Sequence, residues 1–111
     1  MSMTEFIKDY HSFVSTSKEK YYKTTLFEND ALLVGTNCFE PGQEMRKHAH
    51  TEQNRFYLVL EGQARVCLDE DESDIFKDQV FFVPAGHAHW LKNTGQSQFV
   101  VLVGIAPAHA D

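Results

Sequence analysis

The most informative stretch of the chain is His48-Ala-His-Thr-Glu-Gln-Asn-Arg-Phe-Tyr-Leu-Val-Leu-Glu-Gly62. His48 and His50 are separated by one residue, so on an extended strand both imidazoles project from the same face. Two imidazoles on one face can bind a metal ion, and a third from another strand would complete a site with open positions for chemistry. Pro84-Ala-Gly-His-Ala-His89 lies downstream, and its Pro-Gly turn would present His89 as that third ligand. We therefore predict one divalent metal bound by three histidines.

Two groups of residues in this part of the chain resemble the two sequence motifs of the cupin family. The first group is Gly42, His48, His50 and Gly62, and the second is Pro84, Gly86, His89 and Asn93. The two matches cover residues 42–62 and 78–93, about a third of the chain. The resemblance implies an all-β fold, a double-stranded β-helix or jelly-roll barrel, with the metal site inside the barrel.

The chain departs from the family pattern at two places. A Glu usually supplies a fourth ligand in the first motif, and Arg55 stands at that position here. Asp78-Gln79 replaces the Gly-Asp pair that usually opens the second motif, which affects only a turn. Three neutral imidazoles leave a divalent metal its full charge, and such a centre favours an anionic ligand such as hydroxide or a substrate carboxylate, thiolate or enolate.

A centre with three histidine ligands resembles those of the cupin-type thiol and β-diketone dioxygenases. The resemblance makes Fe²⁺ the first choice of metal, with Zn²⁺, Ni²⁺ and Mn²⁺ as alternatives, because affinity alone does not identify the metal used in the cell. The implied function is a small-molecule metalloenzyme of dioxygenase type. Two alternatives stay open: a metal-dependent isomerase or lyase, and a non-catalytic cupin that binds or senses a sugar or metabolite, because function belongs to the site and not to the fold.

Arg55 admits two interpretations. As a functional residue, its planar guanidinium would bind a substrate carboxylate through two parallel hydrogen bonds, and we take Arg55 and Tyr57 as the catalytic candidates. As a structural residue, Arg55 would reach solvent or pair with Glu52 at the rim of the barrel. Glu52 lies two residues past His50, so on a continuing strand it would share that face and could replace the missing carboxylate as a fourth metal ligand.

Four further residues are candidates, together with Arg55, for the wall of a substrate pocket. They are Met45, Tyr57, Phe82 and Trp90. An aromatic set at strand spacing is more often plain core than a substrate site. Tyr57 is the exception, because its hydroxyl needs a polar partner inside a barrel, and a metal-bound water or the substrate is such a partner.

The hydrophobic pattern predicts a short N-terminal helix followed by strands. Apolar residues recur at helical spacing over residues 3–14, and residues 1–20 are expected to form this helix and a polar link. Residues 21–111 then form a single barrel domain of strands separated by turns. Within it, the acidic residues 69–74 are predicted to be a solvated hairpin tip, and residues 75–83 the next strand.

Two predicted strands, residues 55–60 and 99–103, are apolar on both faces. A sheet with one face in water should alternate apolar and polar residues, so the outer face of these strands must be covered. The second sheet, the N-terminal helix or another subunit could cover it. We predict a homodimer that buries this surface.

Composition limits the partners of the protein. At 111 residues the chain is expected to be one domain. Its net charge of -6 disfavours nucleic acid and anionic membrane surfaces, which attract basic patches, and favours a small-molecule partner. The longest apolar run, residues 99–106, is shorter than the roughly 20 residues of a membrane span. No signal-peptide pattern is expected at the N-terminus, and Cys38 and Cys67 are expected to be packed thiols, so we predict a cytoplasmic protein.

Overall fold

The computed structural model describes residues 2–109, which form two short 3-10 helices and a set of antiparallel strands. The helices are η1 (Met3–Phe6) and η2 (Tyr10–Phe13). The strands are β1 (Tyr22–Glu28), β2 (Leu33–Phe39), β3 (Asn54–Glu61), β4 (Gln63–Leu68), β5 (Asp71–Phe76), β6 (Val80–Val83), β7 (His89–Lys92) and β8 (Phe99–Ala106).

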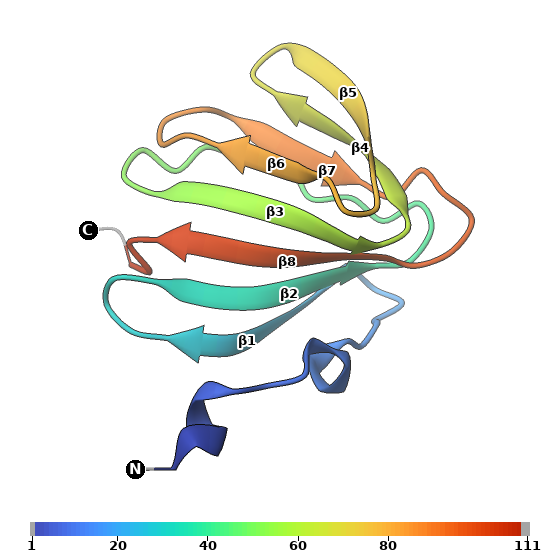
Figure 1. Cartoon of the computed structure of the whole chain (residues 1–111). Coiled ribbons are helices and arrows are strands. Elements are labelled where there is room, and N and C mark those ends of the chain that lie inside the picture. Colours follow the sequence, from blue (N-terminus) through green and yellow to red (C-terminus); the bar gives the residue numbers. More distant parts are fainter. Residues whose placement is uncertain (1, 110–111) are drawn as a thin grey trace.

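The strands are arranged in two facing sheets (Figure 1). The larger sheet has the order β1-β2-β8-β3-β6, and the smaller has the order β5-β4-β7. The last strand, β8, lies between β2 and β3, so segments far apart in the sequence are hydrogen-bonded neighbours. This arrangement is a jelly-roll barrel, and the predicted all-β fold class is confirmed.

The interior of the barrel is filled by alternate residues of its strands. In β3, Tyr57 and Val59 are fully buried, as expected if position 55 faces inward. Phe99 in β8 and Leu91 in β7 pack into the same cluster. Complete burial of one such side chain contributes about 1.5–3 kcal/mol to the free energy of folding. The cluster therefore stabilises the strands that carry the candidate site residues.

The predicted helix over residues 3–14 is wrong in its extent. The structure has η1 and η2 instead, and the backbone between them is extended. Ser2 caps the first helix and Asp9 the second, each by accepting a backbone N–H two residues later. The carbonyl of Phe13 accepts a hydrogen bond from the Thr24 hydroxyl at 2.6 Å. Local caps and bonds to β1 therefore take the place of a continuous helical ladder.

Residues 69–83 also differ from the prediction. Residues 71–74 belong to β5, with exposed side chains, and residues 75–83 are divided between β5 and β6. The turn between the strands contains Asp78 with a φ of 74°, in the left-handed region that Asp tolerates better than most residues. Because β5 pairs with β4 and β6 pairs with β3, this turn takes the chain from one sheet to the other.

The N-terminal segment lies at one edge of the larger sheet and leaves the other edge uncovered. It lies beside β1, at the opposite edge from β6 (Figure 1). On β6, the side chains of Val80 and Phe82 are 59% and 58% exposed. None of the helices in residues 2–109 has the length and apolar character needed to cross a bilayer.

Candidate metal and small-molecule site

Two backbone hydrogen bonds hold His48 and His89 opposite each other. The amide of His48 donates to the carbonyl of His89 at 3.1 Å, and the amide of His89 donates back at 2.9 Å. The pair forms an isolated antiparallel bridge, because the chain before β3 follows β7 only at separate points. The two imidazole centroids are consequently 4.7 Å apart. His48 of the first motif and His89 of the second, far apart in the sequence, are thus joined directly by main-chain hydrogen bonds.

His50 is held by the Pro-Gly turn. Its carbonyl accepts a hydrogen bond from the amide of Gly86 at 2.9 Å. Gly86 has a φ of 89°, a conformation that glycine adopts without steric cost. The imidazole of His50 meets that of His48 edge to face, with centroids 4.7 Å apart. Three imidazoles from two segments of the chain therefore cluster at one place.

The hydrogen bonds of the imidazoles determine which nitrogens are free. Nδ1 of His48 donates to the carbonyl of Arg46 at 2.7 Å, so Nε2 of that ring is left with its lone pair. A ligating histidine commonly uses one nitrogen in this way, which sets the tautomer and the ring orientation. Nε2 of His89, in contrast, is hydrogen-bonded to the Tyr57 hydroxyl at 2.7 Å, and Nδ1 of His89 is buried without a partner.

The imidazoles of His50 and His89 stay neutral over most of the pH range. Burial, together with the smaller effect of the positive charge of Arg55, lowers the pKa of His50 to about 4. Burial also lowers the pKa of His89 to about 3, with smaller contributions from His48 and Arg55. Both rings are therefore in the form that binds metal at neutral pH.

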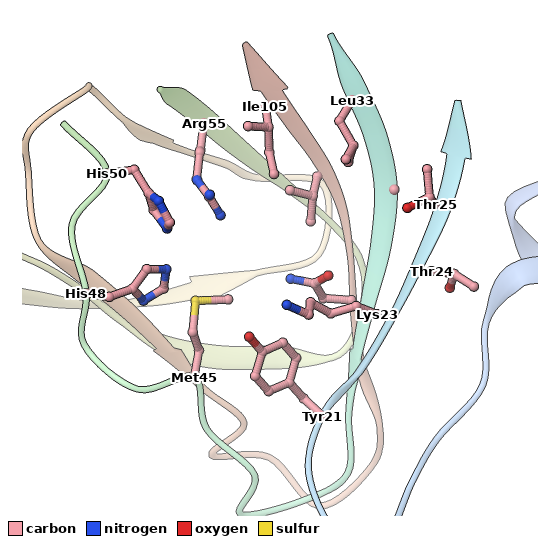
Figure 2. A pocket seen from close by; sticks show the side chains of 13 residues that line it. Tyr21, Lys23, Thr24, Thr25, Leu33, Met45, His48, His50, Arg55 and Ile105 are labelled. Atoms are coloured by element: carbon pink, nitrogen blue, oxygen red, sulfur yellow. The ribbon is translucent and has the colours of Figure 1, made fainter. Parts of the chain in front are cut away.

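A cavity of about 440 Å³ lies beside the imidazoles. Met45 and Arg55, two of the predicted pocket residues, line it together with His48 and His50. In Figure 2 the side chains of His50 and Arg55 extend into it from one side, and that of Tyr21 from the opposite side. A volume of this size falls within the roughly 300–1,000 Å³ of small-molecule sites.

Besides Thr24 and Thr25, three larger polar residues in this cavity were absent from the sequence prediction. They are Tyr21 and Lys23, which precede and enter β1, and Asn37 of β2. A lysine in an otherwise aromatic and β-branched strand is a weak signal that such a strand faces a polar space. The sequence could not reveal that β1 lies across the cavity from β3, because that depends on how four strands are ordered in the sheet.

Arg55 points into the cavity and has no acidic partner. Its Nη2 donates to Oε1 of Gln53 at 2.9 Å, and its Nε is buried without a hydrogen bond. Within residues 2–109, no carboxylate lies within ion-pair distance of the guanidinium. Glu52 is exposed on the turn before β3 and does not line the cavity. The alternative in which Arg55 pairs with Glu52 is therefore not what the structure contains.

Comparison with known proteins agrees with this geometry. Residues 35–105 match the family described as the Cupin domain. The chain belongs to the cupin family.

Individual relatives are similar to this cupin at different levels. TT1209 from Thermus thermophilus has a TM-score of 0.87 and 31% sequence identity, over 91% of this chain and 96% of that chain. A Klebsiella pneumoniae protein with a double-stranded beta-helix domain has a TM-score of 0.89 at 21% identity, over 95% and 92% of the two chains, and shows the fold alone. The tetracenomycin polyketide synthase protein TcmJ of Streptomyces glaucescens is 27% identical over 67 residues, 60% of this chain and 45% of that protein. This cupin spans less than half the length of the curated relatives it matches.

Phe82 and Trp90, which the sequence analysis placed in the pocket, lie outside the cavity. Each is one residue away from the strand position that faces inward. Phe82 is 58% exposed, whereas its neighbour Phe81 faces inward, with its ring centroid 6.0 Å from that of Tyr57. Trp90 follows the buried His89 in β7, so it points to the opposite face and borders a separate surface groove. Successive strand residues face opposite sides of a sheet, so an error of one position reverses the assignment.

Tyr57 is fully buried behind His89 and is not among the residues that line the cavity. Burial raises the pKa of Tyr57 to about 12, so the hydroxyl keeps its proton. The hydroxyl is hydrogen-bonded to the imidazole of His89 at 2.7 Å and makes a longer contact, 3.9 Å, with the sulfur of Met45. Tyr57 is thus placed to orient His89, and the direct contact with substrate that the sequence analysis expected is absent from this arrangement.

The donor chemistry of the three imidazoles fits a divalent metal ion, but their arrangement does not yet form its coordination sphere. Within residues 2–109, no group of three His, Cys, Asp or Glu side chains is shaped to hold a metal. Nε2 of His89 has a single lone pair or proton, so its bond to Tyr57 and a bond to metal exclude each other. The unpartnered Nδ1 of His89 shows that this ring is not satisfied by its present contacts. Metal binding through His89 Nε2 therefore requires that the bond to Tyr57 open.

Proposed function

We propose that this cupin is a metalloenzyme that acts on a small anionic molecule, with one divalent metal held by His48, His50 and His89. The observation that carries the proposal is the convergence of these imidazoles at the wall of a cavity that also receives the guanidinium of Arg55. Neutral imidazoles leave the full metal charge in place, and the nearby guanidinium adds to it. Both features favour an anion as the ligand.

The reaction class we propose first is that of a dioxygenase, with Fe²⁺ as the metal and Zn²⁺, Ni²⁺ or Mn²⁺ behind it. Bound Fe²⁺ would supply the redox chemistry that such enzymes use with molecular oxygen. Arg55 would bind the acid group of the substrate through its unpaired Nε and its terminal nitrogens. Tyr57 would act as a positioning residue for His89. A metal-dependent isomerase or lyase would use the same groups.

A second function is favoured by one specific observation. Within residues 2–109, the Tyr57–His89 hydrogen bond occupies Nε2 of one imidazole beside a formed cavity, and no group of three His, Cys, Asp or Glu side chains is shaped to hold a metal. A non-catalytic protein that binds or senses a metabolite would need only the cavity and its cationic groups. The two functions differ in whether metal is required, and that difference can be measured.

Two further features belong to the proposal. The first is a homodimer, because Val80 and Phe82 form an exposed apolar surface on the edge strand of the larger sheet. A stable interface buries roughly 1,200–2,000 Å² in total, more than this pair alone provides, so the contact would extend over the outer face of β3. The second is a cytoplasmic location, supported by Cys38 and Cys67, which are both buried free thiols.

The proposal is tested by elemental analysis of the purified protein, followed by oxygen-uptake assays on a panel of thiols, β-diketones and aromatic diols. One equivalent of bound metal and oxygen consumption with one substrate class would support a dioxygenase. Bound metal with turnover but no oxygen uptake would favour the isomerase or lyase. Binding of metabolites by protein that takes up no metal would support the sensing function instead.

A further inference from the structure

The charge of the cavity is opposite to that of the protein. The chain has 16 acidic and 10 basic residues and a net charge of -6. Among residues 2–109, the side chains that line the cavity nevertheless include Lys23 and Arg55 and no Asp or Glu. An anion entering the cavity would therefore meet two fixed positive charges, with no carboxylate among the lining residues to repel it. Sequence composition by itself gives no indication of this local reversal.

The two cations come from different strands. Lys23 lies on β1 and Arg55 on β3, and the sheet order places β2 and β8 between them. Neighbouring strands are about 4.8 Å apart, so the two backbones are separated by roughly 14 Å along the sheet. Both side chains extend into the space between, as Figure 2 shows for the labelled residues. They are thus placed to hold two ends of one ligand rather than one acid group in common.

The surroundings of Lys23 form a second polar end of the cavity. The ring of Tyr21 lies with its centroid 5.9 Å from the ammonium nitrogen and is stacked on Phe39 at 4.6 Å. Asn37 is 6% exposed, and it lines the cavity as well. A phenol, an amide and an ammonium group together suit the oxygens of a second acid group.

We propose that the ligand of this cavity is a small dicarboxylate, with one carboxylate at Arg55 beside the imidazoles and the other at Lys23, Tyr21 and Asn37. The inference rests on the proposed function only in taking this cavity as the ligand site. It does not require that metal be bound. A monoacid would leave one of the two cations without a counter-charge, which is why the second acid group adds affinity.

The test measures the binding of simple acids to the full-length protein by calorimetry, first as purified and then after loading with Fe²⁺ under anaerobic conditions. The probes are malonate, succinate, glutarate and adipate. Butyrate and pentanoate serve as monoacids of matched length, and succinamide serves as the neutral analogue. We expect at least one diacid to bind tenfold or more tightly than its matched monoacid, and succinamide to bind no better than the monoacid. Equal binding of diacids and monoacids would overturn the proposal.

The role of Lys23 is tested with Lys23→Gln, with Lys77→Gln as the matched control because Lys77 is exposed on the turn before β6 and outside the cavity lining. Lys23→Gln should abolish the preference for the diacid while leaving monoacid binding at Arg55 unchanged. Lys23→Arg should keep the preference, because it keeps the charge. The control Lys77→Gln should keep the preference for the diacid. If Lys23→Gln also keeps it, Lys23 does not bind the second carboxylate. Failure to find metal or turnover would contradict the proposed enzyme function but would leave this measurement intact.

Discussion

Replacing Tyr57 by Phe tests whether the Tyr57 hydroxyl would compete with a metal ion for the imidazole of His89. In the structure the Tyr57 hydroxyl is completely buried and is bonded to Nε2 of His89 at 2.7 Å. The other nitrogen of that ring already lacks a partner. Tyr57→Phe keeps the aromatic ring in its packing and removes only the hydroxyl. The imidazole of His89 then has no hydrogen bond from either nitrogen.

The expected magnitude follows from the cost of an unpaired buried group, about 1–3 kcal/mol. Without metal, the free energy of unfolding of Tyr57→Phe should fall by about this amount. A metal ion that takes Nε2 of His89 must first displace the hydroxyl in the parent protein but not in the variant. Metal affinity should therefore rise in Tyr57→Phe, by roughly 5- to 150-fold for a difference of 1–3 kcal/mol.

Two measurements check this pair of effects. Urea unfolding with and without saturating metal gives the stabilities, and competition with a chelator gives the metal affinity. Tyr21→Phe is the matched control, because it removes a hydroxyl from the same cavity without any contact to His89. The reasoning fails if Tyr57→Phe binds metal more weakly than the parent, or if its stability without metal is unchanged. The first result would mean that the hydroxyl does not compete with metal for the imidazole, and the second that its bond to His89 does not stabilise the fold.

The remaining predictions concern the ligands, the anion site, the interface and the packing of the larger sheet. The double variant His48→Ala, His50→Ala should lose bound metal by elemental analysis, because two of the three donors are gone. Arg55→Ala should weaken binding of the best acid about 10- to 100-fold in calorimetry and leave metal content intact, since a charge-assisted hydrogen bond contributes about 1.5–3 kcal/mol; Arg55→Lys should restore only part of it. In sedimentation, Phe82→Asp should convert a dimer to a monomer at micromolar concentration, because a charge would be buried at the apolar contact. Gly104→Ala should lower the free energy of unfolding by about 1–3 kcal/mol, because the added methyl group would overlap a phenylalanine ring packed on that backbone.

Each of these predictions has an outcome that contradicts it. A full metal complement in the double histidine variant would remove the assigned ligands. Unchanged acid binding in Arg55→Ala would leave the guanidinium without the role proposed here. A monomeric mass for the parent protein would refute the dimer before Phe82 needs to be tested. A Gly104→Ala variant as stable as the parent would show that the phenylalanine ring moves aside without a loss of stability.

The motifs predicted the centre of the site because local spacing controls it. His48 and His50 are two residues apart, and the turn at Gly86 is tied to His50 by one main-chain bond. His89 follows that turn, so its pairing with His48 needs little information beyond the two motifs. If position 55 faces inward, as the resemblance implies, alternation within β3 puts Tyr57 on the same face; in the structure Arg55 lines the cavity and Tyr57 is buried.

The sequence analysis failed where the local hydrophobic pattern fits two structures equally well. Phe81 and Phe82 are identical in type, and no sequence signal says which of them faces inward. The register of β6 against β3 decides it, pairing Tyr57 with Phe81. The N-terminal residues show helical spacing, but their carbonyls and side chains bond to β1, and those tertiary contacts outweigh a weak helical preference.

The sequence by itself indicated the all-β barrel, through its resemblance to the two cupin motifs, and a strand face shared by His48 and His50. The shared face depends only on a two-residue spacing within one segment, which the geometry of an extended strand converts directly into a common side. Only the tertiary structure decided that Tyr57 occupies a nitrogen of His89, that Arg55 pairs with no carboxylate of residues 2–109, and that Lys23 lies across the same cavity. Those features depend on how separate strands are ordered and registered, and the sum of many weak long-range contacts, rather than any local pattern, sets that order.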